Sequence, residues 1–276
     1  MLPSYLLSLR EGIEAALIIG IVLSALRKIH RTELIPALWL GALFAIAVSV
    51  LSAILLTRFG LSLQGSAEVV FEGGTMLVAA GILTWMIFWM GRQARTLKSE
   101  LEEDVNKAAA STGKRAVFWL AFMAVVREGI ELALFLTASV FATNALQTAL
   151  GAVLGLGTAI LLGWSIFAAI VRLDLRRFFQ VTGFLLILFA GGLVAQGVHE
   201  FNEISWIPSV IEHLWDVNAF INNTSTLGQL LKALFGYNGS PSLTEMLAYF
   251  SYLAVVGLAL RGGRKKPENI TTQIQT

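Results

Sequence analysis

Long apolar runs separated by short polar segments occupy most of the 276-residue chain. Each run approaches the roughly 20 residues that an α-helix needs to cross a hydrocarbon core of about 30 Å. The pattern predicts seven membrane-spanning helices, over residues 4–26, 34–57, 68–90, 116–141, 149–171, 179–199 and 243–260. Composition agrees, because 56% of the residues are hydrophobic and 14% are charged, whereas about a quarter are charged in a soluble domain. We therefore expect an all-α, polytopic membrane protein.

Basic residues gather in alternate loops of this predicted chain. They lie in the loops after the first, third and fifth helices and in the C-terminal tail, whereas the intervening loops hold only Arg58 and Lys232. Cytoplasmic loops of membrane proteins carry an excess of Lys and Arg. This pattern predicts an N-terminus outside the cell membrane and a C-terminus in the cytoplasm. The net charge of +2 is explained by topology, so we expect no nucleic-acid partner.

The whole chain, residues 1–276, is predicted to form one membrane domain. Its parts are a first three-helix unit (1–90), a cytoplasmic helical loop (91–115), a second three-helix unit (116–199), an outer or interfacial segment (200–242), a seventh helix (243–260) and a cytoplasmic tail (261–276). Charges of both signs in the loop favour a solvated helix that extends the third span. Trp85 and Trp89, near the inner end of that span, are typical of aromatic anchors at a membrane interface.

The sequence Arg-Glu-Gly-Ile-Glu, called here the REGIE motif, occurs at residues 10–14 and again at 127–131. The two copies lie in the first and fourth predicted helices, which cross the membrane in opposite directions. This arrangement indicates an inverted repeat of three plus three helices with one C-terminal helix added. Transporters built in this way hold their substrate near the bilayer midplane, at the interface between the repeats.

Charged side chains are expensive inside a bilayer, at about 3 kcal/mol each on insertion scales. We therefore expect the motif charges to face the bundle interior and one another. Four carboxylates and two guanidiniums leave a formal charge of −2, and carboxylates are hard ligands that suit hard cations. The candidate metal ligands are Glu11, Glu14, Glu128 and Glu131, with Arg10 and Arg127 as partners or gates and Gly12 and Gly129 as sites of close helix approach.

Further ionisable residues are predicted near the outer side. Glu72 begins the third span one turn after Glu68, and Glu200 and Glu203 follow His199 at the end of the sixth. We expect Glu72, Glu200 and Glu203 to form an acidic entrance for a cation. Glu200 and Glu203 also fit an ordinary helix end that meets water, and Glu68 also fits a boundary residue of the span. The residues Glu212, His213 and Asp216 add acidic character to the same outer segment.

Several alternatives remain open on the residues alone. The motif charges could be ion pairs that lock helices together in a protein that transports nothing. A membrane di-metal carboxylate oxidase is a second alternative, although the predicted spans hold no Glu-x-x-His pair of the kind such bundles use. A carrier of another divalent cation such as manganese is a third, since glutamates fit it too. The absence of cysteine excludes thiolate metal sites and disulfides.

The paired motifs, the seven spans and the outside N-terminus resemble the oxidase-dependent iron transporter family, which includes fungal high-affinity iron permeases and bacterial EfeU-type iron permeases. Its signature is Arg-Glu-Gly-Leu-Glu in the first and fourth helices, and here isoleucine replaces leucine in both copies. The stretches "FEGG…LTWMIFWM" and "FGYNGSPSLTE" are similar to the bacterial branch. The resemblance covers about residues 1–260.

The resemblance implies an iron permease and not an enzyme, in a bacterial inner membrane with a periplasmic N-terminus. It implies that the motif glutamates bind iron, as Fe3+ or Fe2+, during its passage, with no organic cofactor. The expected partners are the lipid bilayer and periplasmic iron-binding or iron-oxidising proteins. The sequence leaves open the oxidation state of the iron, the driving force, the oligomeric state, and the roles of Glu68, His199 and His213.

Overall fold

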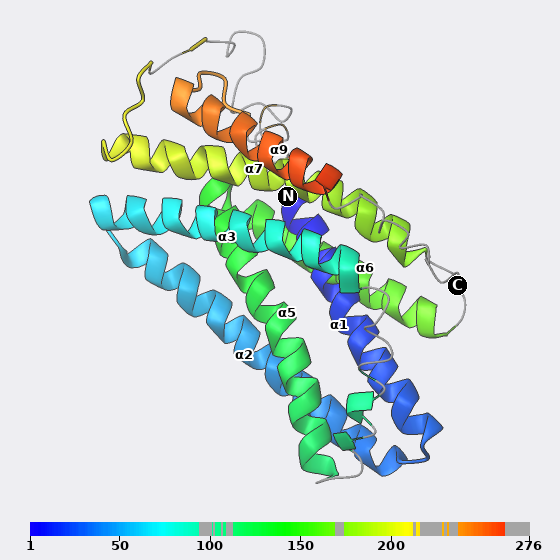
Figure 1. Ribbon diagram of the computed structural model, residues 1–276. Coiled ribbons are helices and arrows are strands. Elements are labelled where there is room, and N and C mark those ends of the chain that lie inside the picture. The colour runs from blue at the N-terminus through cyan, green and yellow to red at the C-terminus, as the bar shows by residue number, and fades with distance from the viewer. Residues whose placement is uncertain are drawn as a thin grey trace, which may run out of the picture.

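The computed structural model describes residues 1–93, 101, 103–105, 107–108, 113–168, 174–211, 214–215, 228, 231 and 237–262. Over these residues the regular structure is helical (Figure 1). The elements are α1 (Leu2–Lys28), the 3-10 turn η1 (Thr32–Leu34), α2 (Ile35–Ser62), α3 (Ser66–Gln93), α5 (Lys114–Ala142), α6 (Ala145–Phe167), α7 (Leu175–Glu203) and α9 (Leu243–Gly262). The predicted all-α class is confirmed.

Five of these helices, α2, α3, α6, α7 and α9, are long and apolar enough to cross a membrane. The helices α1 and α5 are equally long but carry the REGIE motifs. Every 18-residue stretch of either helix holds at least three charged side chains. Hydropathy alone therefore does not mark them as spans.

Capping residues move several helix boundaries from their predicted positions. The Asn144 side chain accepts a hydrogen bond from Leu146 N at 2.8 Å, so α6 begins four residues earlier than predicted. Asp174 accepts one from Arg177 N at 3.1 Å and starts α7 at Leu175. The helix α7 continues to Glu203, which places the predicted outer residues from 200 to 203 on a helix. Arg58, predicted in a loop, lies in the last turns of α2.

Within the predicted cytoplasmic loop, the residues that the structure describes between 101 and 108 are helical. Glu103 and Lys107 form an exposed ion pair with 2.7 Å between Oε1 and Nζ. Val105 is fully buried against residues of α1, α2 and α5, so this segment packs onto the bundle. In the 200–242 segment, Glu212, His213 and Asp216 fall outside the described residues, as does the tail from 263 onward.

The helices pack in pairs that cross between the two predicted repeats. The helix α1 lies along α6 and crosses α5, while α2 lies along α5. The helix α3 lies beside α7, and α9 packs on the other side of α7 (Figure 1). The largest apolar core lies where α1, α3, α5 and α7 meet, around the fully buried Leu7, Leu83, Phe135 and Leu186.

Close glycine contacts repeat in this arrangement. A Cβ added at Gly12 would lie 2.6 Å from Ala159 Cβ on α6, and one added at Gly129 would lie 2.0 Å from Ser49 Oγ on α2. The motif glycines are 117 positions apart, and their partners are 110 positions apart. A second pair of contacts shows the same two offsets. A Cβ at Gly41 would meet the Phe118 carbonyl, and one at Gly151, 110 positions later, would meet the carbonyl of Met1, which lies 117 positions before Phe118. The α1–α6 and α2–α5 packings are therefore equivalent in register.

Gly129→Ala is expected to destabilise the protein by about 1–3 kcal/mol, the usual cost of overpacking a tight contact. The added methyl would occupy the space of the Ser49 side chain. Thermal unfolding of the purified protein in detergent measures the loss. The second change Ser49→Gly removes the colliding atoms and should restore most of the stability. Gly157→Ala is the matched control, because nothing lies within 4 Å of a Cβ at that position. Equal effects of Gly129→Ala and Gly157→Ala would contradict the packing described.

Candidate metal site

The crossing of α1 and α5 brings the two REGIE motifs together. Glu11, Glu128 and Glu131 each offer a carboxylate oxygen, and these atoms all lie within 4.8 Å of one another. Glu128 and Glu131 share a face of α5 because residues three apart are neighbours on a helix. Within the part of the chain that the structure describes, this is the group whose geometry suits a metal ion. We call Glu11, Glu128 and Glu131 the glutamate site.

Glu14 lies outside this group of three and pairs with Arg10 instead. Arg10 Nε lies 3.2 Å from Glu14 Oε1. The second motif repeats the pairing four residues apart, with Arg127 Nε 3.2 Å from Glu131 Oε1. Arg127 Nε also lies 4.0 Å from Glu128 Oε1. The two copies therefore share their ion-pair spacing, but the second glutamate belongs to the metal group in one copy only.

Two carboxylates of the glutamate site are buried, and the third, Glu131, is 14% exposed. Glu11 is 2% exposed, and Glu128 is also buried. Both oxygens of Glu11 and Oε2 of Glu131 are shielded from solvent and make no hydrogen bond within the described residues. A buried carboxylate without a partner is costly, and in proteins such groups are paired or coordinate metals. The unsatisfied oxygens therefore fit a cation that the three side chains would hold together.

The expectation that all motif charges face the interior fails at Arg127. The Arg10 side chain is 2% exposed, whereas that of Arg127 is 42% exposed. Arg127 lies on the same face of α5 as Met123 and Ile130, both of which are exposed. Its Nε is the atom that lies near the glutamates. The outer face of its guanidinium is covered by Trp89, whose ring centroid lies 4.6 Å from Cζ. Trp89, expected only as an interface anchor, therefore contacts the motif.

The predicted acidic entrance lies where α3 begins and α7 ends. Glu72 on α3 is within electrostatic range of Glu68, Glu200 and Glu203. A Cβ added at Gly73 would lie 3.1 Å from Glu200 Cβ, which shows how closely the two helices approach here. The carboxylates are thus neighbours, although within the described residues they do not converge on one point as the glutamate site does.

Glu245, at the start of α9, was missed by the sequence interpretation. It is buried, and its Oε1 accepts hydrogen bonds from Ser242 N at 3.1 Å and pairs with His199 Nδ1 at 2.9 Å. Ser242 Oγ in turn accepts a hydrogen bond from Glu245 N at 3.3 Å. These reciprocal bonds form a capping box, which the sequence Ser-Leu-Thr-Glu could have indicated. Through His199, Glu245 joins α9 to the end of α7 beside the acidic entrance.

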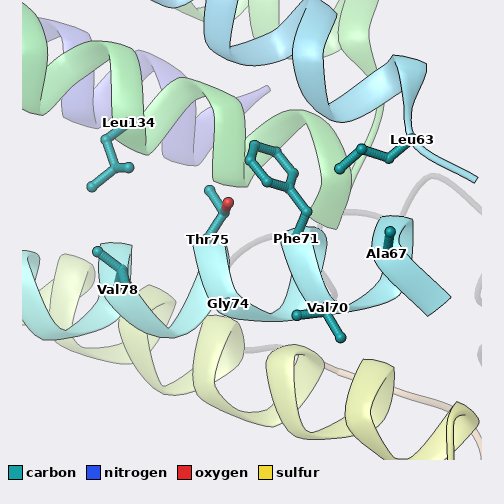
Figure 2. A pocket seen from close by; sticks show the side chains of 8 residues that line it. All are labelled: Leu63, Ala67, Val70, Phe71, Gly74, Thr75, Val78 and Leu134. Carbon is teal, nitrogen blue, oxygen red and sulfur yellow. The ribbon is translucent and has the colours of Figure 1, made fainter.

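A separate groove of about 490 Å³ runs along the first half of α3. Figure 2 shows the apolar side chains that line it, including Val70 and Val78 of α3, Leu63 after α2 and Leu134 of α5. Thr75 supplies a hydroxyl, and no lining residue is ionisable. A dehydrated cation needs several anionic or polar oxygens, and this lining offers a single hydroxyl, so the groove is poorly suited to hold one.

The family and the relatives that the chain matches are all described as iron permeases. The Iron permease FTR1 family matches residues 1–263. The chain is 34% identical over 264 residues to the ferrous iron permease EfeU of Shigella sonnei and to that of Escherichia coli O157:H7, which covers 94% of this chain and 96% of each relative. It is 32% identical over 255 residues to the ferrous iron permease EfeU of Yersinia pestis, covering 92% of this chain and 90% of that relative. No solved structure gives a significant match.

Proposed function

Because the chain belongs to the iron permease family, we propose that the iron it imports passes through the glutamate site. The predicted iron transport is confirmed by the relatives, and the chain is a multi-pass membrane protein. Those relatives are named permeases, so the chain is a transporter and not the membrane oxidase considered from its residues. The route through Glu11, Glu128 and Glu131 is our proposal.

One observation carries this route. Three carboxylates from helices that belong to different halves of the chain converge in the protein interior, and Glu11 has two oxygens without hydrogen-bond partners. Carboxylate oxygens would replace water molecules of a hard cation as it enters. Arg127 pairs with Glu131 and so competes with the metal for that carboxylate. The competition limits how tightly iron is held and allows it to leave.

Iron would reach this site from the acidic entrance formed by Glu72, Glu200 and Glu203. Negative charge at a channel mouth raises the local concentration of cations. We place the entrance at the periplasmic face of a bacterial inner membrane, with the N-terminus on that side and the C-terminus in the cytoplasm. The alternation of basic loops supports this orientation. A periplasmic iron-binding or iron-oxidising protein would deliver iron at the same face.

The bundle itself is proposed to be an inverted repeat. In this arrangement α1, α2 and α3 correspond to α5, α6 and α7, and α9 is added at the end, which makes seven spans. The equivalent glycine contacts of α1 with α6 and of α5 with α2 support the correspondence for the first two helices of each half. An inverted repeat would also explain why helices of opposite direction carry the same motif at the same depth.

Ferrous iron is expected to enter proteoliposomes at least about fivefold faster than ferric iron, because a more highly charged cation binds the same carboxylates more tightly and leaves more slowly. The relatives are named for ferrous iron, which supports the same choice. Radioactive iron is supplied either with a reductant or as a ferric chelate, and vesicles without protein give the background.

An added excess of manganese is expected to leave most of the iron uptake intact, since Mn²⁺ binds such sites more weakly than Fe²⁺. Equal inhibition by manganese and by unlabelled iron would favour a general divalent carrier. Faster entry of ferric iron would overturn the assigned oxidation state but leave the route through the glutamates standing.

A further inference from the structure

The two motif arginines stand in unequal surroundings. Arg10 is enclosed, whereas Arg127 is the one charged motif side chain with a large exposed fraction, 42%. Its Nε lies 3.2 Å from Glu131 Oε1 and 4.0 Å from Glu128 Oε1. Arg127 therefore stands between two ligands of the glutamate site and the outside of the helix bundle, on the side where α3 meets α5.

Trp89 holds the other face of this guanidinium. Its ring centroid lies 4.6 Å from Arg127 Cζ, a distance suited to a cation–π contact. The ring is itself stacked on Trp85, with 5.9 Å between centroids and 22° between planes. Trp89 lies near the C-terminal end of α3, which is the cytoplasmic end in the proposed orientation. Arg127 is thus held between a carboxylate on one side and the ring of Trp89 on the other.

The opposite side of the glutamate site is closed by direct contact between α1 and α5. Ser4 Oγ and Ser139 Oγ lie 2.9 Å apart near the proposed periplasmic ends of these helices. Between this contact and the glutamates, Leu7 and Phe135 are fully buried. A packed interface therefore separates the site from that face, whereas on the α3 side the outermost motif group is a single side chain.

We propose that Arg127 is the movable wall of the glutamate site, past which iron leaves toward the cytoplasm, and that Trp89 is the positioning residue that holds this wall in place. The proposal rests on the proposed passage of iron through the glutamates. It gives the second arginine a role that the first, enclosed arginine does not share. It also explains why an aromatic side chain of α3 contacts a motif on α5.

Loss of the Trp89 ring is expected to change iron binding and iron transport in opposite directions. Without the ring of Trp89, the guanidinium is held less firmly against Glu131 and neutralises the carboxylates less. Iron then meets a more negative site, so it binds more tightly and leaves more slowly. General damage to the fold would instead weaken iron binding and uptake together. Binding and transport should therefore move in opposite directions only if Trp89 acts through Arg127.

The test compares Trp89→Leu with Trp85→Leu, a matched loss of the neighbouring indole, since the cation–π contact that the structure shows for Arg127 is with Trp89. Equilibrium binding of radioactive iron is measured on the purified full chain, and uptake is measured in proteoliposomes at equal protein content. Trp89→Leu is expected to tighten binding and to lower the maximal uptake rate, each about fivefold, the scale of one cation–π contact. Trp85→Leu should leave both near the wild-type values, and Trp89→Phe, which keeps a ring, should recover most of the uptake.

Unchanged binding and uptake in Trp89→Leu would overturn the proposal, as would parallel losses of both. Equal effects of Trp85→Leu and Trp89→Leu would also overturn it, because the pair would then act only as a membrane anchor. Glu131→Gln is assayed alongside as a check on the site itself. If that variant binds iron normally, the glutamate site fails as an assignment, which is distinguishable from a failure confined to Trp89.

Discussion

Glu131→Gln is expected to reduce iron uptake at least tenfold at equal protein level, about the loss that disturbing a metal shell causes. The substitution keeps the shape of the side chain but removes its charge, and Glu131 stands at the centre of the site. It contributes to the group of three carboxylates and also pairs with Arg127. Glu11→Gln should cause a loss of similar size, since both Glu11 oxygens are buried without hydrogen-bond partners.

Two further substitutions serve as controls for Glu131→Gln, namely Glu14→Gln and Glu103→Gln. Glu14 lies outside the group of three and serves Arg10, so its substitution should weaken equilibrium iron binding less than Glu131→Gln does. Glu103 is an exposed carboxylate on the helical loop, and its substitution should leave iron binding and uptake unchanged. Radioactive iron binding and proteoliposome uptake measure both properties. Normal uptake by Glu131→Gln would remove the glutamate site from the mechanism.

Arg10→Met is expected to destabilise the protein by about 3–5 kcal/mol, because it leaves the partner charge of a buried ion pair uncompensated. Glu14 is close to fully buried and loses the guanidinium that lies 3.2 Å from its Oε1. Arg127→Met should cost clearly less, because the guanidinium that it removes is already 42% exposed in the folded chain, although its partner Glu131 is nearly as enclosed as Glu14. The sequence alone gives no reason for this difference, because the two motifs are identical.

Thermal unfolding of the two variants in the same detergent measures the difference, with the Trp fluorescence change followed on heating. Arg10→Met should unfold at a clearly lower temperature than Arg127→Met. The two variants should also differ in how they affect iron transport. Arg10→Met should act mainly through lost stability, whereas Arg127→Met should alter the release of iron from a stable protein. Equal destabilisation by the two substitutions would mean that both arginines are enclosed to the same degree, contrary to their exposures.

Hydropathy predicted the helices well where their sequences are uniformly apolar, as in α2 and α6. It fails as a criterion for α1 and α5, which carry too many charges in every stretch of membrane length. The apolar residues on either side of the charges nevertheless predicted helices over 4–26 and 116–141. The predicted starts of α6 and α7, which capping side chains decide, were four residues late, and the predicted end of α2 was five residues early. A cap is a local feature of one residue, and an average over some 20 apolar positions does not register it.

The candidate site was predictable to the level of the motif. Arginine and glutamate four residues apart on a helix are neighbours, so the Arg10–Glu14 and Arg127–Glu131 pairs follow from spacing alone. That the charges lie inside a membrane protein follows from the apolar runs around them. Glu245 was overlooked because a glutamate in a capping box is an ordinary feature of a helix start, and its contact with His199 depends on how α9 packs on α7.

By itself, the sequence determined the class of protein, the pairing within each motif and the presence of hard, anionic ligands without any thiolate. The tertiary structure decided which glutamates converge, since the crossing of α1 and α5 determines which side chains of the two motifs face one another. That crossing brings Glu11, Glu128 and Glu131 together, while Glu14 stays with Arg10 and Arg127 contacts Trp89. Identical motifs acquire different roles because the helix crossing depends on packing between segments far apart in the chain, which the motif residues do not encode.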